Sequence, residues 1–200
     1  MRIILASQSP RRRELLGQIG IRDFIIRPAV GEEQTSPGLT PGRMVEELSL
    51  HKGLEVAATA QPGDLVIAAD TVVAVDGQVL GKPHSREEAI RMLTALSGRA
   101  HTVYTGVTVC KDEAVLSEHE ATQVRFRALT AAEIQSYVDT GEPMDKAGAY
   151  GIQGVGALLV EGIEGDYFNV VGLPLCRLGR MLARFGVDTL ALCAQKEQKL

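Results

Sequence analysis

The sequence has few cysteines and no long apolar run. Cys110, Cys176 and Cys193 lie far apart, without the close spacing that metal sites require. This odd number, together with an opening apolar stretch too short for a secretory signal, predicts reduced thiols and a cytoplasmic location. Every run of about 18 residues contains charge, so we expect no membrane-spanning helix.

Several motifs of known enzyme chemistry are missing as well. The chain contains no Gly-x-Ser-x-Gly, no Walker A sequence and no dinucleotide-binding pattern. The histidines have no ligand spacing, and no cysteine–histidine pairing suggests a nucleophile. We interpret these histidines as surface residues or as satisfied by hydrogen bonds: His51, His84, His101 and His119.

The composition is that of a globular protein. The 200 residues are 45% hydrophobic and 23% charged, which excludes disorder and predicts one domain of one or two lobes. The net charge of −4 argues against binding to long nucleic acids. It combines +4 in residues 1–13, which hold four arginines and no acid, with −8 elsewhere.

Helical and strand patterns alternate along the chain, with hairpins among them. The clearest hairpin signal is Asp76-Gly77. Strands are predicted over 2–6, 24–26, 65–75, 78–80, 102–110, 114–128, 157–163 and 168–171, with helices beginning near residues 10, 41, 86, 131 and 174. The tail from about 187 is expected to be poorly determined, and residues 195–200 are polar and expected to fray. The pattern predicts an α/β fold with a mixed sheet rather than a purely parallel one.

The segment from Ser7 to Arg12 places a strand, a tight turn and a helix start in succession. Free backbone N–H groups at a helix start favour an anion. Arg11 and Arg12 lie in the first turn, where cations oppose the helix dipole by about 0.3–1 kcal/mol each. A bound phosphate would remove that conflict; the alternative is a solvated basic turn paired with acids elsewhere.

Asp70 interrupts an otherwise apolar strand over 65–73. A buried carboxylate requires a partner, which could be a metal, a reacting proton or a buried cation; the alternative is a sheet edge facing water. Lys52 shares the helical stripe of Val45, Leu48 and Val56, so it either extends to solvent or enters a cleft.

Three further features are weaker. Lys82 follows the hairpin. An ideal register places its side chain on the same face of the sheet as Thr71 and on the other face from Asp70, whereas a bulge at Gly81 could bring it to the side of Asp70. Glu33 lies in an acidic loop that could bind Mg²⁺ or be merely solvated. In the glycine-rich segment 145–154, Tyr150 could stack on a base and Gln153 could read a base edge, although an ordinary connection is the alternative.

Together these residues suggest a site for phosphates. Arg11, Arg12, Lys52 and Lys82 would contact phosphates, and Asp70 with Glu33 would serve a metal or a water. The pattern therefore indicates a phosphate-ester or phosphoanhydride site.

Several short blocks, in order, resemble the Maf (septum formation inhibitor) family. They run from about residue 3 to about residue 185: Leu5-Ala6-Ser7-x-Ser9-Pro10-Arg11-Arg12, Ala69-Asp70-Thr71, Gly81-Lys82-Pro83, Leu96-Ser97-Gly98, residues 145–154 and Val171-Gly172-Leu173-Pro174. The resemblance implies a long, twisted mixed sheet flanked by helices, two lobes with a central cleft similar to inosine triphosphate pyrophosphatases, and a homodimer. It also implies hydrolysis of a nucleoside triphosphate to the monophosphate and pyrophosphate with a divalent cation such as Mg²⁺ or Mn²⁺.

The resemblance assigns roles to individual residues. Asp70 matches the proton acceptor that activates water, and Glu33 matches an acidic position thought to help with metal, which Asp70 could share. The positions that match phosphate contacts are Ser7, Arg12, Lys52 and Lys82.

Three positions separate the branches of the family. Arg11, Thr71 and Gln153 match the branch that acts on dTTP and UTP, whereas the 7-methyl-GTP branch carries Trp, Gln and Glu there. Two alternatives stay open: a nucleotide-binding regulator of cell division, which would not need Asp70, and a pyrophosphatase of different base specificity.

Overall fold

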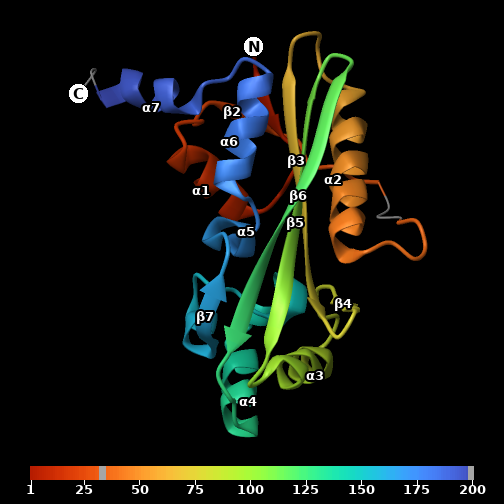
Figure 1. The fold of residues 1–200 in the computed structure, drawn as a ribbon, viewed down its shortest axis with the longest axis vertical. Coiled ribbons are helices and arrows are strands. Elements are labelled where there is room, and N and C mark those ends of the chain that lie inside the picture. Colours follow the sequence, from red (N-terminus) through yellow and green to blue (C-terminus); the bar gives the residue numbers. More distant parts are fainter. Residues whose placement is uncertain (32–34, 198–200) are drawn as a thin grey trace. The chain divides into compact units, whose positions relative to one another are not determined.

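The computed structural model describes residues 1–31 and 35–197 of the chain (Figure 1). Its helices are α1 (Pro10–Gln18), α2 (Pro41–Ala57), α3 (Arg86–Leu96), α4 (Ala131–Asp139), α5 (Tyr167–Val171), α6 (Leu175–Arg184) and α7 (Thr189–Glu197), with short 3₁₀ segments η1 (Glu142–Asp145), η2 (Ala147–Ala149) and η3 (Val155–Leu159). Within the described ranges, no helix is both long and apolar enough to span a bilayer.

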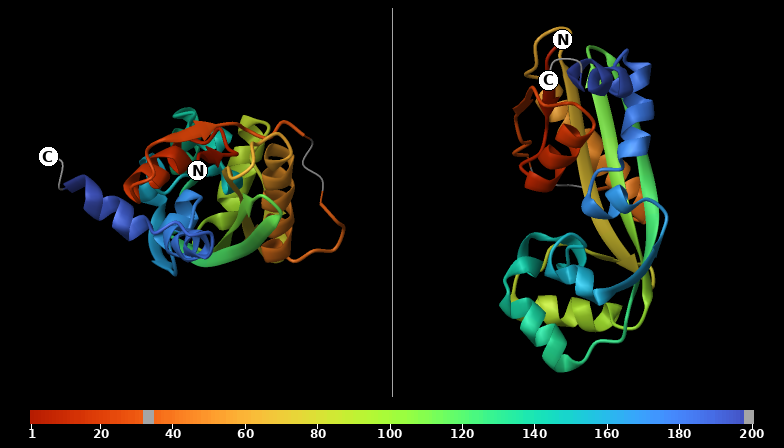
Figure 2. Two further views of the ribbon diagram at one scale, coloured as in Figure 1. Left: turned by 90° about the horizontal axis from the view of Figure 1, so that it is seen from above. Right: turned by 90° about the vertical axis from the view of Figure 1, so that its left-hand side faces the viewer.

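The strands form one twisted, mixed sheet, which confirms the predicted fold class (Figures 1 and 2). They are β1 (Ile3–Leu5), β2 (Phe24–Ile26), β3 (Leu65–Val75), β4 (Gln78–Leu80), β5 (Ala100–Lys111), β6 (Ala114–Phe126) and β7 (Val160–Glu164). The order is β2-β1-β3-β5-β6-β7, with β4 pairing β3. β1 is parallel to β2 and β3, whereas β4 and β7 pair antiparallel with β3 and β6.

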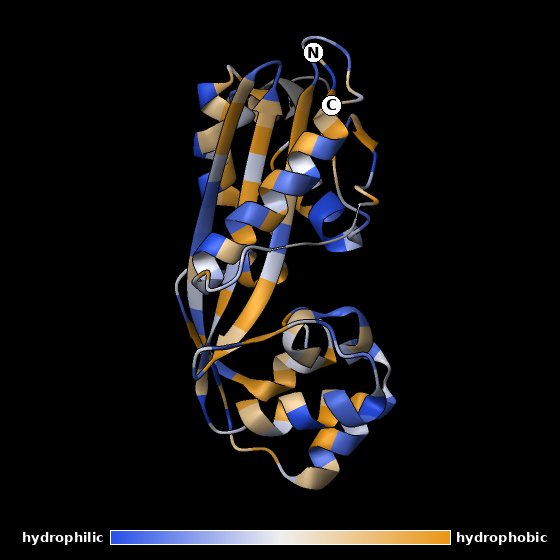
Figure 3. Cartoon of the chain, turned by 90° about the vertical axis from the view of Figure 1, so that its right-hand side faces the viewer, coloured by the Kyte–Doolittle hydropathy of each residue, from blue (hydrophilic) through white to orange (hydrophobic). Residues whose placement is uncertain are grey.

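The chain divides into two compact units, each with its own core. The first comprises Met1–Asp70, Thr105–Glu120 and Gly172–Leu200, and the second comprises Thr71–Tyr104 and Ala121–Val171. Ile4, Val66 and Cys110 belong to the core of the first unit. A larger cluster around Leu93 and Phe126 fills the second. Figure 3 shows hydrophobic residues on several strands of the sheet, whereas the helices carry both hydrophobic and hydrophilic residues. The central cleft stays a prediction.

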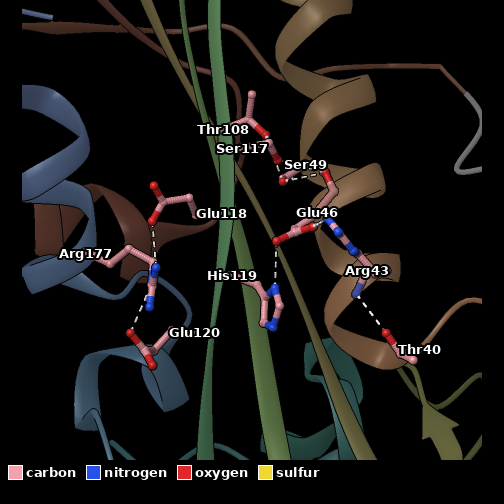
Figure 4. Close-up of polar contacts among 10 residues, drawn as sticks. All are labelled: Thr40, Arg43, Glu46, Ser49, Thr108, Ser117, Glu118, His119, Glu120 and Arg177. Atoms are coloured by element: carbon pink, nitrogen blue, oxygen red, sulfur yellow. Dashed lines mark hydrogen bonds and ion pairs between the residues drawn. The ribbon is translucent and has the colours of Figure 1, made fainter. Parts of the chain in front are cut away.

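In the first unit, helices cover both faces of β6. Successive side chains of a strand point to opposite faces, so His119 faces α2 whereas Glu118 and Glu120 face Arg177 of α6 (Figure 4). On the neighbouring strand β5, Gly106 allows α2 to approach closely, because a Cβ there would lie 2.0 Å from the carbonyl oxygen of Val45.

The predicted hairpin is confirmed. Asp76 and Gly77 have φ of 50° and 75°, as a two-residue type I′ turn requires. Val73 pairs with Leu80, the expected register. That register places Thr71 opposite Lys82 if it continues beyond β4.

The structure corrects the strands predicted for the C-terminal region. Residues 168–171 form α5 rather than a strand, because the Asp166 carboxylate accepts the N–H of Phe168 at 2.7 Å and caps the helix. Beyond residue 187, Asp188 accepts the N–H of Ala191 at 3.0 Å and starts α7, which extends away from the rest of the first unit (Figures 1 and 2). The strand expected over 157–163 divides between η3 and β7.

Candidate functional site

The strand acid and the helix lysine meet in the first unit. Lys52 Nζ of α2 forms an ion pair with Asp70 Oδ1 of β3. Their side chains are only 19% and 13% exposed. The helical stripe that buries Val45 and Val56 also directs Lys52 towards the sheet, so its ammonium lies against the carboxylate instead of extending to solvent. A buried cation is therefore a partner of Asp70.

Arg12 holds the turn after β1 against β3. Its Nη1 donates to Ser7 Oγ at 3.2 Å and to the carbonyl oxygen of Ala69 at 2.8 Å. Its Nε donates to the carbonyl oxygen of Gly172 at 2.8 Å. These bonds go to a hydroxyl and to main-chain oxygens. They place the buried Ser7 and a guanidinium beside the residue that precedes Asp70.

The start of α1 keeps the features of an anion site. Pro10 is its first residue, and the Ser9 side chain makes no capping hydrogen bond. The first turn contains no acid, and Arg11 is half-buried there. Donors at this helix start thus lie on the same turn as two guanidinium groups.

The remaining predicted substrate contacts belong to the second unit. Thr71 is half-buried directly after Asp70, and Lys82 and Gln153 are exposed. The glycine-rich segment packs on the hairpin, where the Gly148 N–H donates to the carbonyl oxygen of Gly81 at 3.0 Å. This bond ties the segment that carries Gln153 to the residue before Lys82.

Glu33, predicted to assist with metal, lies outside the described residues. Among the residues that are described, no three histidine, cysteine, aspartate or glutamate side chains cluster as a metal site. The available donor is the Asp70 carboxylate, a hard oxygen ligand of the kind that Mg²⁺ takes together with substrate phosphates.

Tyr150 does not offer a stacking face to a base, contrary to that interpretation. It is 5% exposed and packs edge-on against Phe126 and His101 in the core of the second unit. Its hydroxyl lies 2.8 Å from Nε2 of His101. Burial lowers the pKa of His101 to about 4, so this histidine is a neutral core residue.

Cys110 is likewise a core residue of the first unit. Burial raises the pKa of Cys110 to about 11, which suppresses its reactivity as a thiolate. Sequence reasoning missed Asn169, which is fully buried and donates to the carbonyl oxygen of Val103 and to Thr122 Oγ1, both at 3.0 Å. It also missed Glu142, whose carboxylate accepts bonds from Tyr137 and from two backbone N–H groups. Neither residue belongs to a pattern that marks it before the fold is known.

A mixed α/β sheet, the Lys52–Asp70 ion pair and a basic helix start are typical of proteins that bind phosphorylated small molecules. The family model for Maf-like proteins matches residues 2–185. The chain therefore belongs to the Maf family.

Its relatives among characterised sequences are similar over almost their whole length. A protein of Moorella thermoacetica named dTTP/UTP pyrophosphatase is 56% identical over 94% of this chain and 96% of its own. One of the same name from Symbiobacterium thermophilum is 53% identical over 92% of this chain and 94% of its own.

Solved structures with a similar chain trace are more distant. A dITP/XTP pyrophosphatase from Mycobacterium abscessus is 15% identical with a TM-score of 0.45 and covers 92% of this chain and 97% of its own. A HAM1 protein from Coxiella burnetii is 17% identical with a TM-score of 0.47, covering 92% of this chain and 99% of its own.

Proposed function

We propose that this protein is a nucleoside triphosphate pyrophosphatase that hydrolyses dTTP and UTP to the monophosphate and pyrophosphate. The observation that carries the proposal is the ion pair between Lys52 and Asp70, with Arg12 bonded to the carbonyl group just before Asp70. One oriented carboxylate beside basic side chains suits attack by water on a polyphosphate. The names of the relatives at 56% and 53% identity support the same reaction.

In the proposed reaction, Asp70 accepts a proton from the water that attacks the α-phosphorus. The bond from that phosphorus to the oxygen bridging to the β-phosphate breaks, and its electron pair leaves with pyrophosphate. Arg12 and Lys52 would offset the charge that builds on the phosphate oxygens. The ion pair with Lys52 keeps the carboxylate oriented before substrate binds.

A divalent cation, Mg²⁺ or Mn²⁺, fits this donor set. Asp70 would hold it, with Glu33 assisting, alongside phosphate oxygens of the substrate. The cation would supply charge neutralisation on the departing pyrophosphate.

The choice of base is proposed to depend on Arg11, Thr71 and Gln153. Thr71 follows the proposed proton acceptor directly, and Gln153 is exposed in a glycine-rich segment that packs on the hairpin of Thr71. Exchanging Thr71→Gln together with Gln153→Glu should weaken dTTP and UTP relative to other nucleotides. An unchanged substrate profile would place base recognition elsewhere.

The proposal is tested by pyrophosphate release across dTTP, UTP, CTP and modified pyrimidine nucleotides. Asp70→Asn should abolish release while calorimetry still detects nucleotide binding. Asp23→Asn, at an exposed position of the first unit, is the matched control. Full turnover by the Asp70→Asn enzyme would exclude Asp70 as the base. A wild-type protein that binds nucleotides but releases pyrophosphate from none would favour the regulator.

Homodimer formation and a cytoplasmic location are part of the same proposal. They rest on the family resemblance and on the reduced cysteines expected of the sequence. Sedimentation of the purified protein at two concentrations tests the first, and cell fractionation tests the second.

A further inference from the structure

The loop over residues 150–156 is built around the carboxylate of Glu142. Oε2 of Glu142 accepts the N–H of Val155 at 2.8 Å, and Oε1 accepts the N–H of Gly156 at 3.0 Å. Oε1 also accepts the Tyr137 hydroxyl at 2.8 Å, and that hydroxyl oxygen accepts the N–H of Gly151 at 3.2 Å. Backbone groups on both sides of Gln153 are therefore bound directly or indirectly to one side chain.

The packing leaves no space between the loop and this carboxylate. A Cβ on Gly154 would lie 2.3 Å from Oε2 of Glu142, and one on Gly156 would lie 2.6 Å from the Tyr137 hydroxyl. Real Cβ atoms do not approach other atoms so closely. The glycines beside Gln153 thus allow the backbone to close over Glu142.

Lys146 contacts both the loop and Glu142. Its Nζ donates to the carbonyl oxygen of Glu142 and to Oδ1 of Asp145, both at 2.6 Å. A Cβ on Gly151 would lie 2.6 Å from Cε of Lys146. Gly151, near the start of the loop, therefore packs against a lysine that is hydrogen-bonded to the backbone of Glu142.

The charge on Glu142 matters to this geometry. Burial alone would raise the pKa of Glu142, but the N–H groups of Gly156 and Val155 and the Tyr137 hydroxyl hold it below its ordinary value. An ionised carboxylate accepts at both oxygens, as the three bonds require. A glutamine of the same size can accept at only one of them, because its amide nitrogen is a donor.

We propose that Glu142 is a positioning residue for base recognition, which holds the loop so that Gln153 is presented to the pyrimidine ring of the nucleotide. This inference rests on the proposed function and deepens it. Glu142 bonds the backbone on the C-terminal side of Gln153, so removing its charge lets the loop shift while Asp70, Lys52 and Arg12 stay in place. The effect should therefore appear in KM and base selectivity rather than in turnover.

The test compares E142Q with wild type and with E164Q, a matched change at an exposed acid of the second unit. We expect E142Q to raise KM for dTTP and UTP about tenfold, the size of a lost charge-assisted hydrogen bond. The preference for dTTP over CTP should fall while kcat at saturation changes little. Amide hydrogen exchange should become faster over 150–156 in E142Q, and E164Q should match wild type in all three measurements.

A double-mutant cycle distinguishes positioning from a general loss of stability. If Glu142 acts through Gln153, E142Q should not change the dTTP-to-CTP preference further once Gln153→Ala is present. Should E142Q fail to fold, Y137F carries the same test, because it removes one donor to Glu142 at nearly constant volume.

The outcomes separate this inference from the function on which it rests. A wild-type enzyme without pyrophosphate release from any nucleotide overturns both. An active wild type whose base preference is the same in E142Q or Y137F overturns the positioning role alone. An equal fall in kcat for all nucleotides also overturns it, because that result would describe damage to the reacting centre.

Discussion

Arg12 Nη1 donates to the carbonyl oxygen of Ala69 at 2.8 Å, one residue before Asp70. A side chain from the first helix thus fixes the backbone of the strand that carries the proposed proton acceptor. The same guanidinium reaches Ser7 and Gly172, so one planar group joins three segments that are distant in sequence. The position of Asp70 therefore depends on the fork shape of arginine as well as on its charge.

Replacing Arg12 with lysine should lower kcat/KM for dTTP by about 100-fold, because an ammonium lacks the planar fork of donors through which Arg12 bonds its three acceptors. The unfolding free energy should fall by about 1–3 kcal/mol, since carbonyl groups lose their donors. Pyrophosphate release and urea unfolding measure the two effects. Arg13 is the next residue and is exposed, so Arg13→Lys should change neither kcat/KM nor the unfolding free energy. Equal effects at both positions would contradict a special role for Arg12.

The ion pair of Lys52 and Asp70 should show strong energetic coupling. K52M leaves a largely buried carboxylate without this cation and should cost about 1–3 kcal/mol of unfolding free energy. D70N should recover part of that loss when combined with K52M, with a coupling energy of about 0.5–3 kcal/mol in a double-mutant cycle.

The matched control for this cycle is the exposed pair of Arg125 and Glu161, joined at 3.0 Å. The R125M and E161Q cycle should give less than about 1 kcal/mol, as exposed ion pairs do. Similar coupling in both cycles would mean that the partial burial of Lys52 and Asp70 adds nothing to their interaction.

Sequence patterns could predict Asp70 and Lys52 because each breaks a strong local rule. An acid within an apolar strand and a lysine on an apolar helical stripe both require an explanation, and the fold supplies one by pairing them. Glu142 breaks no such rule. An acid after a helix is typical of a solvated surface, and its backbone partners follow 13 and 14 residues later.

The strand wrongly predicted at 168–171 has a similar cause. Val170 and Val171 favour a strand by local propensity, but Asp166 caps a short helix there. Tyr150 was misassigned because a tyrosine beside glycines suits either a ligand or a core. Only the tertiary contacts with Phe126 and His101 decide between them.

The buried His101 should make stability depend on pH. Its pKa is lowered to about 4 in the folded protein from an ordinary value of 6.5. Between these values the unfolded chain binds a proton that the folded chain does not, so stability rises with pH across this window and is lost as pH falls from about 6.5 towards 4. The loss should reach up to about 3 kcal/mol.

Urea unfolding at several pH values measures this contribution of His101. H101F/Y150F removes both partners of the hydrogen bond together. Its unfolding free energy should rise less steeply with pH between about 4 and 6.5 than that of Y150F alone. His84→Gln, at an exposed position, should keep the wild-type slope. An identical slope in H101F/Y150F and Y150F would show that His101 is not the group responsible.

Gly106 controls how closely α2 approaches the sheet, and α2 carries Lys52. A Cβ at position 106 would lie 2.0 Å from the Val45 carbonyl oxygen, a backbone atom that cannot move without the helix. G106A should therefore lower the unfolding free energy by about 1–3 kcal/mol or more. It should also reduce turnover, because the displaced helix withdraws Lys52 from Asp70.

Gly17 provides the contrasting substitution, since a Cβ there meets nothing within 4 Å and the residue lies inside α1. G17A should raise stability by about 0.5–1 kcal/mol through the better helix propensity of alanine, with turnover unchanged. Thermal unfolding and pyrophosphate release on both variants test the pair. If G106A retained wild-type turnover, the close approach of α2 would not be needed to place Lys52, and the ion pair would have to tolerate a displaced helix.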